Sequence, residues 1–141
     1  MELQNVEASD MKQLSRLLYI SADLERIADH AENIANYTIT VSESKLNFSQ
    51  TAIEELQDLG RVTAELMSMA YTAYEKQDKS KLPQIKELEN HVDSLSALYA
   101  KNHFKRLKRK LCKPKSGVVY MDIVNDLEKS ADNAEKIMIS M

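Results

Sequence analysis

The sequence predicts an all-α protein, an antiparallel four-helix bundle of long helices joined by short loops. Only 2 Gly and 2 Pro occur in 141 residues, so few turns can form and long helices are favoured over many short strands. Long stretches of the chain carry apolar residues at the three- and four-residue spacing of a helix face. Hydrophobic residues make up 43% and charged residues 29%, which is typical of a globular domain with a sizeable core. Residues 1–141 are therefore treated as a single helical domain.

The first helix is predicted over residues 6–41, and its apolar face has two rows. One row repeats every seven residues, and the other consists of leucines and alanines: Ile20, Ile27, Ile34 and Val41, and Leu14, Leu17, Leu24, Ala28, Ala31 and Ala35. Because alanine side chains are small, we expect another helix to approach closely at the second row.

Three more helices are predicted, over residues 48–76, from Ser80 to Leu111, and from Val118 to the last residue. Asn47 is the expected N-cap of the second helix, with Gln50 as its capping-box partner three residues later. Ser80 is the expected N-cap of the third helix. Residues 113–117, KPKSG, contain Pro and Gly and are predicted to end the third helix.

An acidic stretch occurs twice, as DLERIADHAENI at residues 23–34 and as DLEKSADNAEKI at residues 126–137. When 23–35 is aligned with 126–138, eight of thirteen positions are identical, whereas chance would give about one. Each copy carries three acids at helical spacing: Glu25, Asp29 and Glu32 in the first, and Glu128, Asp132 and Glu135 in the second. The first and last helices share one core in the predicted bundle, so we expect the two acidic strips to approach one another.

These strips predict a metal site. Residues four apart on a helix stand one above the other, so Glu25 and Asp29 project side by side next to the alanine row. Half-buried carboxylates need a cation, and the neighbouring Arg26 points about 100° away along the helix. Carboxylate oxygens suit Fe, Mn, Mg or Ca, and His30 would add a nitrogen ligand that admits Zn or Ni. The competing interpretation is a solvated helix face.

Two further acidic pairs have the same spacing, Glu54 with Asp58 and Glu89 with Asp93. They are either surface pairs or ligands supplied from facing helices. His91 and His103 are isolated and are interpreted as surface or packing residues rather than as ligands.

Charge is distributed unevenly, although the net charge is only −3. No acid occurs between Asp93 and Asp122, and eight basic residues do: Lys101, Lys105, Arg106, Lys108, Arg109, Lys110, Lys113 and Lys115. This run is either a solvated helix end favoured by the helix dipole or a patch for an anionic surface. Nucleic-acid binding is not expected because no recognition motif accompanies it. The single Cys112 excludes a disulfide within the chain, and no signal peptide or membrane span is visible.

The stretch DLERIADHAENIA, residues 23–35, resembles the signature of PhoU-like domains, a family that carries Glu/Asp-x-x-x-Asp motifs on a repeated three-helix unit. ELENHVDSL, residues 87–95, is similar to a second recurring element of that family. The segment from His103 through Cys112 to GVVYMDIVNDLE, residues 117–128, is similar to the C-terminal domain of bacterial Na/Pi-cotransporter family proteins.

The resemblance implies a cytoplasmic, metal-binding regulatory domain that controls phosphate uptake at the inner face of the cell membrane and is not an enzyme. The implied metal ligands are Glu25, Asp29, Glu128 and Asp132, and the implied ion is Fe, Zn, Mn or Ni. The implied partners are the membrane domain of a phosphate transporter, an anionic membrane surface bound by residues 101–115, and a second copy in a homodimer. We expect the chain to be part of a longer polypeptide.

The second copy departs from the family pattern at three positions, Lys129, Ser130 and Asn133. The first copy, with His30, is therefore predicted to be the better metal site. Two other functions remain open, a metal-free helical interaction module and a carboxylate-bridged metalloenzyme. The metalloenzyme is less favoured because such bundles use Glu-x-x-His, and no histidine here has a glutamate three residues before it.

Overall fold

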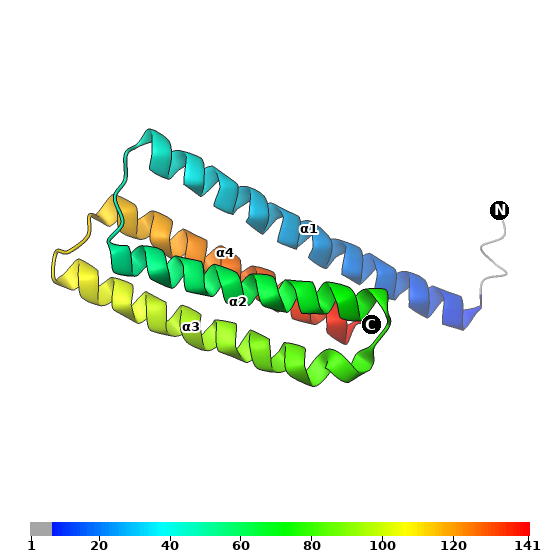
Figure 1. Cartoon of the computed structure of the whole chain (residues 1–141). Helices are drawn as coiled ribbons and strands as arrows, with labels where there is room; N and C mark the ends of the chain where they lie inside the picture. The colour runs from blue at the N-terminus through cyan, green and yellow to red at the C-terminus, as the bar shows by residue number, and fades with distance from the viewer. Residues whose placement is uncertain (1–6) are drawn as a thin grey trace.

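The computed structural model describes residues 7–141 and confirms an all-α helical bundle. Its four long helices are α1 (Ala8–Glu43), α2 (Gln50–Glu75), α3 (Leu82–Lys108) and α4 (Pro114–Ile139), and a short 3₁₀ turn, η2 (Lys79–Lys81), precedes α3. Successive helices run in opposite directions (Figure 1). No strand occurs among residues 7–141.

Three of the helices form the core, and α1 lies outside it. Helices α2, α3 and α4 all pack against one another, whereas α1 packs mainly on α4 (Figure 1). The largest fully buried side chains all come from these three helices: Leu59, Leu66, Ile85, Val92, Tyr120, Val124 and Met138. In α1 only Ile20 and Asp23 are buried. The first helix therefore contributes less to the common core than expected: Ile20 is buried and Ile27 packs against the core, while the alanine row of α1 stays exposed.

The helix ends differ from the sequence prediction in ways that the caps explain. Ser49, not Asn47, caps α2, since its hydroxyl accepts a hydrogen bond of 3.1 Å from the amide of Ala52. The amide N–H of Ser80 donates a hydrogen bond of 3.0 Å to the carboxylate of Asp78, the residue that caps η2. Ser80 therefore does not cap α3, whose N-cap position is Lys81. The expected start of the first helix at Val6 lies outside the described residues.

The prediction that the KPKSG segment ends the third helix is wrong, because this segment begins the fourth helix. Helix α3 ends at Lys108, and Pro114 lies in the first turn of α4, where a missing backbone N–H costs nothing. The chain reverses just before it, and Lys110 there adopts a positive φ of 57°.

Close packing against His103 explains why residue 117 is a glycine. A Cβ at this position would collide with the imidazole of His103. That ring is buried and stacks on Tyr120 with 5.3 Å between ring centroids. His103 is thus a packing histidine, and His91 is exposed, so both fit the two roles expected for them.

Candidate functional site

Helices α3 and α4 bring two acidic pairs together. Glu89 and Asp93 lie one turn apart on α3, and Glu128 and Asp132 lie one turn apart on α4. Asp93 and Glu128 line the same open groove of about 310 Å³ between the two helices. These four residues and Glu135 of α4 are called the acidic cluster below.

The electrostatics of the acidic cluster show an excess of negative charge. Glu89 is only 5% exposed, and burial, followed by hydrogen bonding to Asp93 and Glu135, raises its pKa to about 7. Burial also raises the pKa of Glu128, and the neighbouring Asp93 carboxyl raises it further. For both carboxyl groups, burial removes water and a neighbouring acid further disfavours the charged form.

The nearby cations neutralise one end of the cluster. Lys86 Nζ lies 3.0 Å from Glu135 Oε1 and 3.5 Å from Glu89 Oε2, and its contact with Glu135 raises the lysine pKa. Lys136 lies 3.1 Å from Asp132 on the same helix. Glu135 Oε2 is buried and has no hydrogen-bond partner within the described part of the chain.

The acidic cluster offers the type of ligand atom that a hard metal ion prefers, but its side chains do not converge on a single point. Its ligands are all carboxylate oxygens, which hard cations prefer. No group of three or more His, Cys, Asp or Glu side chains among residues 7–141 converges closely enough to hold an ion as the side chains stand. A bound ion therefore requires rotation of side chains such as Glu128 and Asp132.

The first copy of the repeat lies in a different environment. Glu25 and Asp29 are exposed on α1. His30, expected to support them, instead contacts Asp126 of α4, with 2.8 Å between Nδ1 and Oδ1. The structure therefore does not bring the two acidic strips together, and that expectation is wrong. The reason is the rotation of α1, which places Ile20 and Ile27 toward α4.

Equivalent aspartates of the repeat are buried at or beside the contact between α1 and α4. Asp126 accepts hydrogen bonds from His30 and, at 3.5 Å, from Asn33, while Asp23 pairs with Arg26 at 3.0 Å. Burial raises the pKa of the Tyr37 hydroxyl, and Asp126 raises it further. The sequence signal for this role was present, because both copies of the repeat start with this aspartate.

A second polar network was missed by the sequence analysis. Glu55 of α2 is buried, and its carboxylate lies 2.8 Å from Arg106 Nη2 and accepts hydrogen bonds from Tyr120 (2.9 Å) and Asn102 (2.6 Å). Its position on the apolar face of helix α2 was the available signal. Arg106 therefore differs from the rest of the basic run, because its guanidinium is half-buried and pairs with Glu55. The other seven cations of that run are exposed: Lys101, Lys105, Lys108, Arg109, Lys110, Lys113 and Lys115.

The other acidic pair of the sequence analysis, on α2, does not join the cluster. Glu54 is exposed and accepts a hydrogen bond of 3.3 Å from Gln50. Asp58 accepts hydrogen bonds from Tyr99 and Arg61, which lower its pKa. Its carboxylate is thus already neutralised by side chains of the protein.

Comparison with known proteins places this chain in a family. The family model described as PhoU domain matches residues 1–38 and 56–141. The chain belongs to the PhoU domain family. The unmatched residues 39–55 cover the end of α1, the loop and the start of α2.

Two curated relatives of this PhoU domain carry similar names. The phosphate-specific transport system accessory protein PhoU homolog 1 of Thermotoga maritima is 25% identical over 127 residues, which cover 90% of this chain and 54% of the relative. The phosphate-specific transport system accessory protein PhoU homolog of Streptococcus pneumoniae serotype 4 is 24% identical over 130 residues, 92% of this chain and 59% of the relative. The chain thus spans little more than half the length of these relatives. No solved structure matches it.

Every helix in the described part of the chain falls short of the length and apolarity that a membrane crossing requires.

Proposed function

We propose that this PhoU domain is a metal-binding regulatory module that controls phosphate uptake and has no catalytic activity of its own. The observation that carries the proposal is the acidic cluster, in which carboxylates on two facing helices outnumber the cations beside them. The names of the relatives, accessory proteins of phosphate-specific transport systems, support the regulatory part.

The proposed ligands at the α3–α4 contact are Glu89, Asp93, Glu128 and Asp132. A bound ion supplies positive charge that neutralises these carboxylates and ties α3 to α4. Because no histidine accompanies them, Fe or Mn suits this set better than Zn or Ni. Glu25 and Asp29 on α1 are proposed as a second, surface ligand pair, completed by groups outside α1.

The proposed partner is the membrane domain of a phosphate transporter, including the Na/Pi-cotransporter type whose C-terminal domain the sequence resembles. In this arrangement the module lies in the cytoplasm at the inner face of the membrane. The seven exposed cations of the basic run support the placement, because anionic lipid headgroups attract such clusters.

One observation favours a second candidate, a metal-free interaction module. Lys86 already bridges Glu89 and Glu135, and the raised pKa of Glu89 allows a proton to take the place of an ion. The two candidates differ in whether the acidic cluster takes up metal at neutral pH.

Elemental analysis tests the choice directly. Purified protein is stripped with chelator, reconstituted separately with Fe, Mn, Zn and Ni, and desalted. We expect Fe or Mn to be retained by the wild type and lost from the Glu89→Gln/Asp93→Asn variant. Retention of no metal by the wild type would sink the metal-binding proposal and leave the interaction module.

A further inference from the structure

A buried hydroxyl group at the contact between α3 and α4 has no hydrogen-bond partner. Ser96 of α3 is 9% exposed, and its Oγ atom makes no hydrogen bond within residues 7–141. A serine inside a helix commonly donates to the carbonyl oxygen four residues earlier, as Ser130 of α4 does to Asp126 at 2.7 Å. Because an unpaired buried hydroxyl is unfavourable, the exception at Ser96 requires an explanation.

The position of Ser96 relates it to the acidic cluster. Helices α3 and α4 are antiparallel, and their facing residues pair at alternating steps of three and four along the contact. We call these four pairs the α3–α4 ladder: Lys86 with Glu135, Glu89 with Asp132, Asp93 with Glu128, and Ser96 with Asn125. A salt bridge of 3.0 Å joins the first pair, and the carboxyl groups of the third lie within hydrogen-bonding reach, which fixes the register of the other two.

The two ends of the α3–α4 ladder differ in how their carboxylates are neutralised. At the first end, Lys86 contacts Glu135 and Glu89, and Asp132 pairs with Lys136 at 3.1 Å. No salt bridge in the described chain involves a carboxylate of the third pair. A cation is therefore lacking at the end of the ladder where Ser96 lies.

The last two pairs of the ladder share one groove. Asp93, Ser96, Asn125 and Glu128 all line the open groove between α3 and α4. Together they offer two carboxylates, one hydroxyl oxygen and one amide oxygen, and the open side of the groove admits water. Oxygen atoms of these kinds are the ligands that hard cations such as Mn²⁺ prefer.

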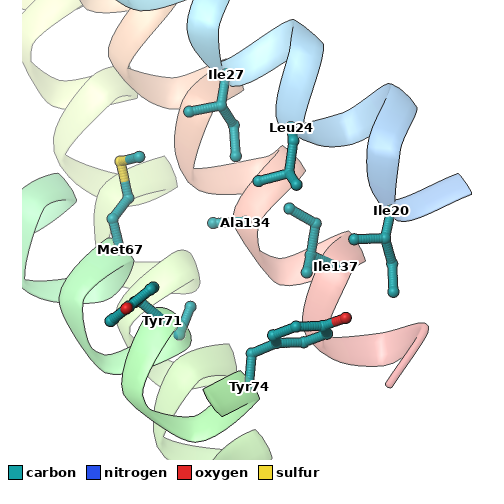
Figure 2. A pocket seen from close by; sticks show the side chains of 9 residues that line it. Ile20, Leu24, Ile27, Met67, Tyr71, Tyr74, Ala134 and Ile137 are labelled. Carbon is teal, nitrogen blue, oxygen red and sulfur yellow. The ribbon is translucent and has the colours of Figure 1, made fainter. Parts of the chain in front are cut away.

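The groove on the other side of α4 has a different chemistry. Figure 2 shows this groove, which has a volume of about 220 Å³ and lies between α1 and α2. Its lining includes Leu24, Ile27 and Met67, and none of the described residues that line it is an acid or a histidine. An ion is therefore expected in the α3–α4 groove and not in the α1–α2 groove.

We propose that Ser96 and Asn125 are neutral oxygen ligands of the ion bound by the acidic cluster, and that they raise its affinity for Mn²⁺ relative to Zn²⁺. The inference rests on the proposed metal-binding function and adds two ligands and a position, the Ser96 end of the α3–α4 ladder. Zn²⁺ is satisfied by about four ligands, which carboxylates can supply, whereas Mn²⁺ favours about six oxygens. Loss of a neutral ligand therefore affects Mn²⁺ more.

The experiment is calorimetric titration of the chelator-stripped full chain with Mn²⁺ and, separately, with Zn²⁺. For Ser96→Ala we expect the dissociation constant of Mn²⁺ to rise about tenfold, while that of Zn²⁺ stays within about threefold of the wild type. Asn125→Ala removes the facing amide oxygen, and we expect the same pattern.

Thr63 provides a matched control. It carries another buried hydroxyl without a hydrogen bond in the described chain, is 2% exposed, and lies on α2 outside the α3–α4 groove. Thr63→Val should leave both dissociation constants within about threefold of the wild type. Thermal unfolding in chelator shows whether the fold is intact, and Ser96→Ala should melt no lower than the wild type because it loses no hydrogen bond.

The possible results separate this inference from the proposed function. A wild type that binds neither ion contradicts both. A wild type that binds Mn²⁺ no better than folded Ser96→Ala and Asn125→Ala leaves metal binding intact and overturns the role of the two neutral side chains. An equal loss of affinity for Mn²⁺ and Zn²⁺ in these variants overturns the selectivity.

Discussion

The two copies of the acidic repeat share most of their residues and differ in nearly everything that the fold adds. In α4 the repeat is packed between α2 and α3, its alanines are buried, and Glu128 faces an acid of another helix. In α1 the same alanines are exposed, and Glu25 and Asp29 stand in solvent. The repeat sequence therefore determines which acids are neighbours on a helix, whereas the facing helix determines whether those acids are buried beside another carboxyl group.

The largest expected effect comes from breaking the network that holds the three-helix core around α4. Glu55→Ala removes the carboxylate that pairs with Arg106 and accepts from Tyr120, which leaves a buried cation unpaired. We expect a loss of about 3–5 kcal/mol in the free energy of unfolding. Urea denaturation measures it, and a loss below about 1 kcal/mol would show that the network does not stabilise the core.

The second prediction uses the raised pKa of Glu89 in metal-free protein. The folded state binds this proton more tightly than the unfolded state, where the pKa is near 4.5. Stability is therefore greatest below the unfolded pKa and falls as the pH rises toward 7, by at most about 3 kcal/mol.

Denaturation at several pH values in chelator checks this dependence. Glu89→Gln should be more stable at pH 7 and should flatten the decline. Glu25→Gln, the matched change on exposed α1, should leave the decline as it is. A wild type whose stability is level from pH 5 to 7 would contradict the shifted pKa.

A smaller effect compares equivalent alanines of the repeat. Ala131→Leu adds three carbons to a fully buried position of α4, and we expect it to cost about 1–3 kcal/mol. Ala28→Leu adds the same carbons at an exposed position of α1 and should change monomer stability by less than about 0.5 kcal/mol. Thermal unfolding of dilute protein compares them, and equal losses would remove the distinction between the two copies.

Sequence alone predicted the helices well because their signals are local. Apolar spacing and the scarcity of Gly and Pro located all four helices, and only their ends moved. Pro114 shows why: the same residue can follow one helix or open the next, and the choice depends on where the chain reverses.

The environment of the candidate site was harder to predict because it depends on helix rotation. His30 favoured the first copy as the metal site, but its ring is directed at Asp126 across the helix contact. Glu89 and Asp93 were recognised as possible ligands from a facing helix, yet only the packed structure brings them beside α4. Which copy binds metal stays a prediction.

The most direct test of the central claim compares metal binding by two matched variants. Glu128→Gln/Asp132→Asn and Glu25→Gln/Asp29→Asn make the same changes at equivalent positions of the repeat. Calorimetric titration of chelator-stripped protein with Mn measures the affinity of each, with the wild type as reference. If the facing helix decides the chemistry, the α4 variant loses the tightest binding and the α1 variant keeps it within about threefold of the wild type. Loss of the tightest binding in the α1 variant alone would contradict the account.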